Sequence, residues 1–143
     1  MSLSTASAIN QAFLDNLSAA SVFGEGQVSN DYGVMESTSA CCCVVNPIGY
    51  LWEAMTFGNN RKNTWQWLLE VKVKDQGDPG QLNRNAIAIT DKVLLTLQSD
   101  DSLQDTIQGI GAVEMSQNLR ELETVGSFSW RAIDVTVTLQ DWD

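Results

Sequence analysis

The sequence predicts an α+β fold: a mostly antiparallel sheet with a long β-hairpin, and two main helices packed on one face of the sheet. Apolar residues recur about every four positions near the N-terminus and again after residue 81, which is the spacing of an amphipathic helix. Between these stretches, residues 64–74 alternate between apolar and polar, which is the spacing of a strand. The expected order is α-β-β-β-α-α-β-β, and strands grouped in this way favour antiparallel pairing.

The first helix is expected over residues 4–20. The hydroxyl of Ser4 is suited to accept a hydrogen bond at the helix N-cap. The apolar stripe of this helix consists of Ala6, Ile9, Phe13 and Leu17.

A loop and a buried strand should follow this helix. Residues 24–39 are rich in Gly, Ser and Asn and are expected to form the loop, with a brief extended piece near Gln27 and Val28. The strand is expected from Ser39 to Asn46, and it should end at Pro47 because proline has no N–H for the sheet.

All three cysteines, Cys41 to Cys43, are adjacent in this strand. Neighbouring positions on a strand are poorly placed for a disulfide, and zinc sites usually gather four ligands from separated segments. A catalytic thiol needs a nearby histidine or other positive charge, and the chain has no histidine. The run is therefore interpreted as apolar strand residues in a reducing compartment, with metal or redox chemistry as the alternative.

A long hairpin occupies the middle of the chain. Its strands are expected at Leu51–Phe57 and Thr64–Lys74, joined by the polar turn Gly58–Asn63. One face of the second strand should carry Trp65, Trp67, Leu69, Val71 and Val73. The other face should carry Gln66, Glu70, Lys72 and Lys74, with Leu68 as the exception.

The second main helix is expected to begin at Asp78 and to run to about Gln98. Asp78 is a suitable N-cap, Pro79 suits the first helical position, and Gln81 would complete a capping box. A short helical turn should follow over residues 99–107, because Leu103 and Ile107 lie four apart, and Gly109 and Gly111 should then break it.

Two strands are expected to close the fold, at Ala112–Gln117 and Ser127–Gln140, with a charged connection over residues 118–126. In the last strand, Phe128 and Trp130 fall on the face opposite the apolar residues that follow. Either a bulge switches the phase, or that end of the strand meets a neighbouring element. The later apolar residues are Ile133, Val135, Val137 and Leu139.

The composition predicts a single globular domain over residues 1–143, since 43% of the residues are hydrophobic. The net charge of −10, with only 8 basic residues, makes a protein that reads nucleic acid improbable. The longest apolar run, Ala40–Val45, is far too short to span a bilayer. We also expect neither a signal peptide nor a myristoylation site, because the first residues lack a basic segment and the required glycine.

The residue inventory argues against an enzyme. Without histidine, Ser-His-Asp and Cys-His arrangements are impossible. The carboxylate pair Asp100–Asp101 suits a helix N-terminus, and residues 100–105 lack the ligand spacing of a calcium loop. Gly109 and Gly111 match no phosphate-binding or dinucleotide-binding motif. We expect no catalytic residues, no metal and no cofactor.

Five tryptophans stand out, at positions 52, 65, 67, 130 and 142. A small domain cannot easily enclose five indole rings, so some are expected at a subunit contact and the others in the core. Arg61 and Lys62 lie at the expected hairpin tip of an otherwise acidic chain. They form either a solvated turn or a basic finger that docks on an acidic neighbour.

These features together resemble the tail terminator and tail completion proteins of long-tailed, siphovirus-like bacteriophages. The resemblance lies in the order of elements over nearly the whole chain, without a signature motif. It includes the N-terminal helix, the Trp-rich hairpin, the capped helix with Ala-Ile-Ala-Ile-Thr-Asp-Lys-Val-Leu-Leu-Thr-Leu, the following Ser-Asp-Asp-Ser-Leu-Gln-Asp-Thr-Ile, and the closing Ser-Trp-Arg-Ala-Ile-Asp-Val-Thr-Val-Thr-Leu. The loop at residues 24–39 and the cysteine run do not match the family.

The resemblance implies a structural protein of the phage neck, assembled in the bacterial cytoplasm and carried in the virion. Family members form homohexameric rings that cap the completed tail tube and join it to the head-side connector or stopper protein. DNA passes through the hole without specific binding, and no membrane is involved. The interface residues expected here are Arg61, Lys62, Trp65 and Trp130.

Other roles remain open at this stage. A related neck part, such as a head-completion protein or stopper, would also form a ring. A small acidic binding module would instead be a monomer that holds a ligand or peptide on exposed tryptophans.

Overall fold

The computed structural model describes residues 5–20, 22–24, 26–36, 40–54, 61–100, 103, 109–117, 123–125 and 128–142. The helices are α1 (Ala6–Ala19), the short 3₁₀ helix η1 (Tyr32–Glu36) and α2 (Pro79–Ser99). The strands are β1 (Val28–Ser29), β2 (Cys41–Ala54), β3 (Arg61–Lys74), β4 (Gly109–Gln117), β5 (Glu123–Val125) and β6 (Phe128–Trp142). The predicted α+β class is confirmed.

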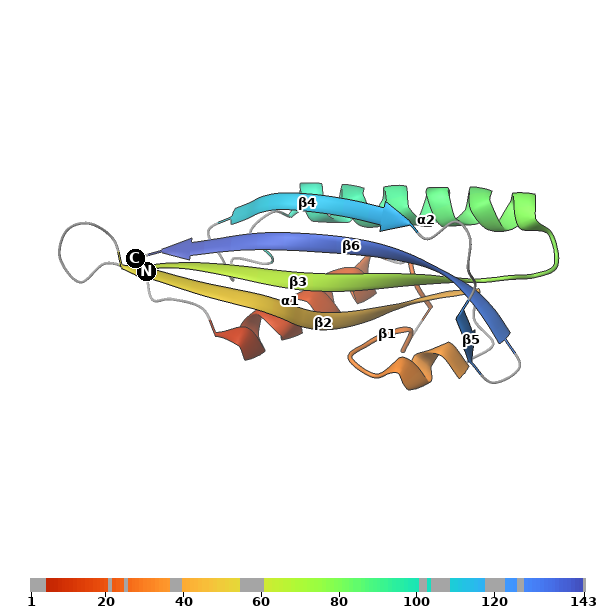
Figure 1. Cartoon of the computed structure of the whole chain (residues 1–143), viewed down its shortest axis with the longest axis horizontal. Helices are drawn as coiled ribbons and strands as arrows, with labels where there is room; N and C mark the ends of the chain where they lie inside the picture. Colours follow the sequence, from red (N-terminus) through yellow and green to blue (C-terminus); the bar gives the residue numbers. More distant parts are fainter. Residues whose placement is uncertain are drawn as a thin grey trace.

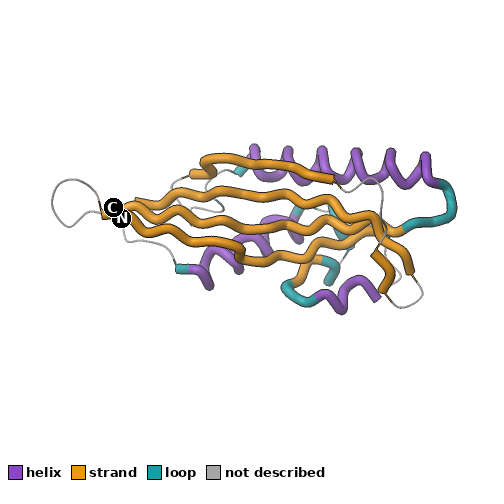
Figure 2. Tube along the Cα trace, in the orientation of Figure 1, coloured by secondary structure: helices purple, strands orange, loops and turns teal. Residues whose placement is uncertain are grey.

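The strands form one six-stranded sheet in the order β1-β2-β3-β6-β4, with β5 also paired to β6. All pairings are antiparallel except that of β1 with β2. Figure 1 shows the three longest strands, β2, β3 and β6, running side by side along the whole molecule, and Figure 2 shows both main helices behind this layer. At one end the strands extend beyond α1 and α2 (Figure 1).

The main core lies between the sheet and the two helices. The residues of α1 that point to the sheet have the expected four-residue spacing, and α2 contributes a matching stripe. The sheet contributes alternate residues of β2, β3 and β6, as expected for strands with one face on the core. The buried members include Ile9, Phe13, Leu17, Leu82, Ala86, Val93, Leu97, Cys43, Val45, Trp67, Leu69, Val71, Ile133, Val135 and Val137.

The opposite face of the sheet is partly covered by η1. Here Met35 packs with Cys42 and Trp130 in a second buried cluster, with Val34 at its margin. This cluster explains why Trp130 lies on the face of β6 opposite the later apolar residues. The β3–β6 register is uninterrupted from Lys62 to Lys74, so no bulge switches the phase, and Trp130 instead meets η1.

The end predicted for the cysteine strand is wrong. β2 continues through Pro47 to Ala54 as a single strand with a register shift between Pro47 and Gly49. Proline is tolerated here because β1 ends at Ser29 and pairs with β2 only as far as Val44, so Pro47 lies on an edge. The expected first strand of the hairpin is therefore the outer half of β2.

The helix caps agree in part with the expectations. Thr5, rather than Ser4, caps α1, and its hydroxyl accepts a hydrogen bond from the Ala8 N–H at 3.2 Å. Asp78 caps α2 as predicted, accepting from the N–H groups of Gly80 and Gln81 at 3.0 and 3.3 Å. Gln81 does not complete a capping box, because its side chain instead bonds with Asn85 and Arg84.

The expectations for the C-terminal half need several corrections. Gly109 and Gly111 lie within β4, which begins three residues earlier than predicted and has a register shift between Ile110 and Ala112. Leu103 has a positive φ of 48°, which is not right-handed helix, and residues 101–102 and 104–107 of the predicted turn lie outside the described residues. The short elements η1 and β5 were expected only as loop, whereas the brief strand near Val28 is confirmed as β1.

Candidate interaction surface

The outer half of β2 presents a row of large apolar side chains to solvent. Ile48, Tyr50, Leu51 and Trp52 are each about half-exposed. The register shift at Pro47 and Gly49 turns Tyr50 and Trp52 toward the helix side of the sheet, and Leu51 toward the other side. Because the sheet extends beyond α1 and α2 here (Figure 1), neither of these two helices covers these residues. Together with Arg61, these four residues form what we term the hairpin-end surface.

A chain of aromatic rings links the core to this surface. Phe13 stacks on Trp67 with 6.0 Å between ring centroids, and Trp67 lies 6.2 Å from Trp65. Trp65 contacts Tyr50 at 4.3 Å, and the Tyr50 hydroxyl donates a 2.9 Å hydrogen bond to the Asn63 Oδ1. These contacts fix the orientation of Tyr50, because its exposed ring packs on the partly buried Trp65 and its hydroxyl is bonded to the buried Asn63.

Arg61 and Lys62 lie at the hairpin end, as predicted, but in strand β3 rather than in a turn. Successive strand residues point to opposite faces of a sheet, so the two cations do not form one basic finger. Arg61 is exposed on the helix side, with its guanidinium 6.0 Å from the Trp52 ring centroid. Lys62 is partly buried on the other side and lies opposite Glu53 of β2. The expected turn residues at 58–60 lie outside the described residues.

Trp65 and Trp130, the two tryptophans expected at an interface, differ in how deeply they are buried. Trp65 is partly buried and packs against the main core, so part of its ring remains accessible at the hairpin end. Trp130 is fully buried within its own chain, where Lys74 lies 5.5 Å from its ring centroid. Trp130 is therefore corrected to a core residue. Of the remaining tryptophans, Trp67 is core and Trp52 belongs to the hairpin-end surface, while the Trp142 side chain lies outside the described set.

The cysteines lie in the inner half of β2. Cys42 and Cys43 are fully buried on opposite faces of the sheet, and Cys41 is half-buried. Burial raises the pKa of all three thiols, to about 12 for Cys42. The three cysteines are free, and within the described residues no three side chains of His, Cys, Asp or Glu gather as metal ligands would.

A buried ionic cluster is present that the sequence reasoning missed. Lys72 is only 1% exposed and lies 3.5 Å from the Glu70 carboxylate. Glu70 also accepts hydrogen bonds from the Tyr32 hydroxyl and, at 2.8 Å, from the Asn46 amide. The alternation of β3 places Glu70 and Lys72 on its polar face. Glu70 and Lys72 are buried because η1 folds over that face. The sequence around η1 predicted only a loop and did not indicate this packing.

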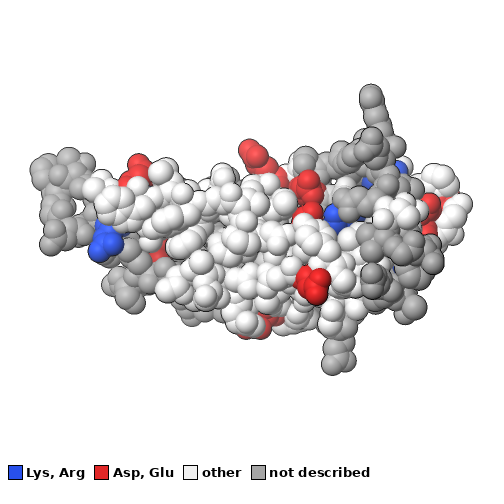
Figure 3. Space-filling view, turned by 60° about the horizontal axis from the view of Figure 1, so that its bottom comes forward, with Lys and Arg blue, Asp and Glu red and all other residues white. Residues whose placement is uncertain are grey.

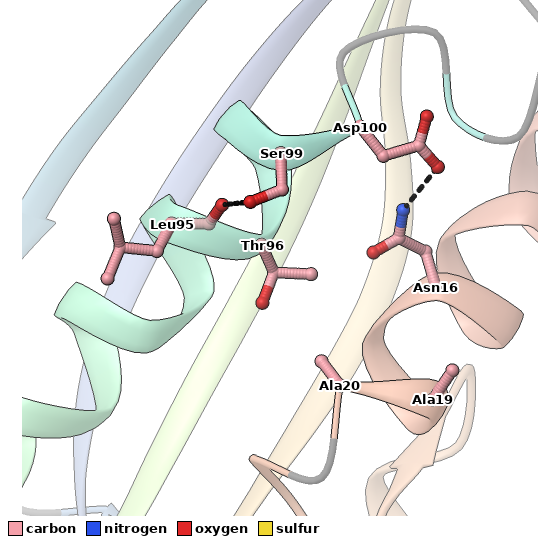
Figure 4. Close-up of a pocket in the computed structure, with 7 residues that line it drawn as sticks. All are labelled: Asn16, Ala19, Ala20, Leu95, Thr96, Ser99 and Asp100. Carbon is pink, nitrogen blue, oxygen red and sulfur yellow. Dashed lines mark hydrogen bonds between the residues drawn. The ribbon is translucent and has the colours of Figure 1, made fainter.

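A shallow hollow lies between the C-terminal ends of α1 and α2 (Figure 4), with a volume of about 440 Å³. Its walls are Ala19 of α1, the C-cap residue Ala20 and Leu95 of α2, with Asn16 and Asp100 at one side. The Asn16 amide donates to the Asp100 carboxylate at 3.1 Å. This hollow joins helix ends that the sequence had placed eighty residues apart, so it could not be predicted from spacing.

The charged groups are spread unevenly over the surface. Figure 3 shows a face whose central area is largely uncharged, with basic groups at the left-hand end and again toward the right-hand end, and with scattered acidic groups. No helix in the described part of the chain combines the length and the apolar character needed to cross a bilayer.

No protein-family model matches this sequence, and no curated protein sequence matches it. The function is therefore argued from the fold and its surfaces.

Proposed function

We propose that the protein is a structural component of a bacteriophage neck. In this role six copies form a ring that caps the tail tube when the tube reaches full length and joins it to the head-side connector. The work is done by interfaces, without catalysis. The proposal rests on the element order that resembles tail terminator proteins and on the sheet-and-helix protomer, which has the fold class that the resemblance implies.

The observation that carries the proposal is the hairpin-end surface. Monomeric proteins rarely expose several large apolar side chains in a row, and such patches usually mark contacts with other proteins. Here Tyr50 and Trp52 share one face of β2 and are half-exposed, with Arg61 beside Trp52, while Leu51 is half-exposed on the opposite face. Aromatic residues and arginine are the residue types that dominate the binding energy of protein interfaces.

The net charge of −10 suits a ring through which DNA moves. An acidic lumen repels the phosphate backbone, so duplex DNA passes without binding. The same charge disfavours a role that requires DNA to be held.

The decisive experiment is to measure assembly directly. Native mass spectrometry and electron microscopy of the purified protein, alone and with tail tubes added, should show a closed six-fold ring with a hole wide enough for duplex DNA. A clean monomer under both conditions would contradict the proposal.

A second experiment tests the hairpin end. Arg61→Glu combined with Lys62→Glu should leave the fold intact, because neither residue belongs to the core, yet should prevent heads from joining tails. The matched control is Arg84→Glu with Lys92→Glu, which makes the same charge change at exposed positions of α2. Wild-type yields of infectious particles from the hairpin variant would remove the hairpin end from the proposal.

Two alternative functions would give different results in these experiments. A head-completion or stopper protein would also form a ring but would bind the connector in the absence of tail tubes. A small binding module is favoured by one specific feature, the half-exposed aromatic pair Tyr50 and Trp52. It would remain a monomer at high concentration and would lose ligand binding on Trp52→Ala.

A further inference from the structure

The sheet ends on each side in a strand that is paired along one edge only. Among the residues that the structure describes, β2 pairs beyond Val44 with β3 alone, and β4 pairs with β6 alone. About half of the backbone N–H and C=O groups of an edge strand point away from the sheet, where a further strand can pair with them. The molecule therefore offers two such edges, on opposite sides of one sheet.

Both edges carry accessible apolar side chains. Tyr50 and Trp52 of β2 are half-exposed, and Val113 and Met115 of β4 are 37% and 53% exposed. The register shifts of the two strands come before the stretches 49–54 and 112–117, and each stretch has a single charged residue, a glutamate. Natural edge strands are usually protected from pairing by several charges, by proline or by bulges. These two stretches have little of that protection.

The exposed apolar residues of the two edges lie on the same face of the sheet. Those of β2 face the helix side, as described above. In β4, Val113 pairs with Val137 and Met115 pairs with Val135, and both valines belong to the main core. Since directly paired residues share a face, Val113 and Met115 also face the helix side.

The strand directions match as well. β2 is antiparallel to β3, β3 to β6, and β6 to β4, so β4 runs opposite to β2 (Figure 1). A second copy placed beside the first in the same orientation brings its β4 to the outer edge of β2 as an antiparallel neighbour. The helices of both copies then lie on one side of a continuous sheet.

The apolar residues suggest the register of this pairing. With residues 112–116 of one copy opposite residues 49–53 of the next, Val113 lies opposite Trp52 and Met115 lies opposite Tyr50. Aromatic residues paired with aliphatic ones are favourable across antiparallel strands. Glu114 then lies opposite Leu51, so the two glutamates of the edges are not directly paired.

We propose that β4 of one copy pairs with the outer half of β2 of the next copy, so that the sheets of successive copies join edge to edge. The contact joins two different surfaces, so it is head-to-tail, and such a contact closes into a ring when the rotation permits. The inference rests on the proposed function, since it names the contact through which the ring forms.

The size of this contact indicates how the ring assembles. The exposed parts of two aromatic and two aliphatic side chains amount to several hundred Å², well below the roughly 1,600 Å² that a standard interface buries. A pair of copies held by one such contact should therefore dissociate readily. In a closed ring every copy is held along both edges, so the ring should form without a stable dimer on the way.

A disulfide trap tests the contact. Leu51→Cys combined with Glu114→Cys in one chain should link neighbouring copies under oxidised glutathione and give a ladder up to the complete ring on a non-reducing gel. The two positions cannot link within one chain, because β3 and β6 separate their strands by about 14 Å, twice the reach of a disulfide. Glu114→Cys with Gly49→Cys or with Glu53→Cys tests the neighbouring registers.

Single-cysteine chains test the head-to-tail arrangement. A mixture of Leu51→Cys and Glu114→Cys chains should give linked dimers and nothing larger, whereas neither chain should link to itself. The wild type reports any linking through the three native cysteines. Leu51→Cys with Asp91→Cys, which places the second thiol on the exposed side of α2, is the matched control and should not form a ladder.

A substitution without cysteine tests the same edge. Met115→Lys should weaken self-association at least about tenfold, because a charged side chain at an edge opposes strand pairing. Ile87→Lys makes the same change at a residue of α2 that is 58% exposed, and should assemble as wild type. Native mass spectrometry over a concentration series measures association, and circular dichroism verifies the fold of each variant.

The outcomes separate the two proposals. A wild type that assembles, with no ladder in any of the three registers and with Met115→Lys assembling equally well, overturns the edge contact and leaves the ring standing. Glu114→Cys chains that link to one another indicate a two-fold contact and overturn the head-to-tail pairing. Leu51→Cys that links only to the tail tube protein shows that another chain occupies the edge, and also overturns it. A wild type that stays monomeric, even with tail tubes, overturns both proposals.

Discussion

The two ends of the β2–β3 strand pair are built from similarly apolar sequence, yet they differ completely in burial. At the inner end, Cys42 to Val45 are buried, with helices on one face and η1 on the other. At the outer end, Ile48 to Trp52 lie mostly exposed beyond the helices. The difference teaches that the local pattern determines where a strand forms, whereas the reach of distant elements determines whether it becomes core or surface.

The largest expected difference in stability between the two ends is that between substitutions of two tryptophans. Trp67→Ala should lower the free energy of unfolding by about 3–5 kcal/mol, because it opens a cavity in the main core. Trp52→Ala at the outer end should cost about 0.5 kcal/mol, as surface substitutions usually do. Urea denaturation at equilibrium measures both. Equal losses would show that the hairpin end is part of the folded core.

The ionic cluster provides the second test. Glu70→Gln should destabilise the protein by about 3 kcal/mol, because it removes the carboxylate charge that lies 3.5 Å from the buried Lys72 ammonium group. Adding Lys72→Met to this variant should restore part of the loss. Glu53→Gln, opposite Lys62 at the exposed outer end, is the control and should have no measurable effect. A large loss of stability in the Glu53→Gln control would show that the outer end is not the solvated surface described here.

The cysteines provide a third test through pH. Burial raises the pKa of Cys42 to about 12, so between pH 9 and 12 the folded state keeps a proton that the unfolded state releases. The folding stability should therefore be nearly independent of this thiol below pH 9 and should fall as the pH rises above it, by at most about 1.4 kcal/mol per pH unit. Cys42→Ala should show a correspondingly shallower decline in urea titrations at pH 9 to 11. Parallel declines for the two proteins would indicate a solvated thiol.

The smallest effect is expected at the cap of α2. Asp78→Ala should cost about 1 kcal/mol, because two backbone N–H groups lose their acceptor. Thermal unfolding measures this loss. Asp78→Asn keeps an acceptor oxygen and should retain most of the stability, so a similar loss in both variants would indicate an effect of charge rather than of capping.

The sequence was sufficient to predict those elements whose signals lie in neighbouring residues of the chain. The alternation from Trp65 to Val73 and the α1 stripe of Ile9, Phe13 and Leu17 depend only on neighbours in the chain, and both appear in the structure as predicted. Ala6, the fourth member of the predicted stripe, is exposed instead. The cap at Asp78 is equally local. Each of these predictions needed a periodicity or a single hydrogen-bonding group, without knowledge of the tertiary fold.

The errors arose where tertiary contacts override local signals. Pro47 ends many strands, but here it lies on a free edge, so β2 passes through it. Trp130 was expected at an interface because a small domain cannot easily enclose five indole rings, whereas η1 covers it. The hollow at Asn16 and Asp100 depends on how two helices end side by side, which no spacing in the sequence reports.

The long ladder between β3 and β6 determines how the protein responds to tension. Every residue from Lys62 to Lys74 has a partner on β6 without a break. A pull on the hairpin end, directed along the strands, loads these pairs together in shear instead of peeling them apart one at a time. The sheet should therefore resist extension between the hairpin end and the helix-covered part of the molecule.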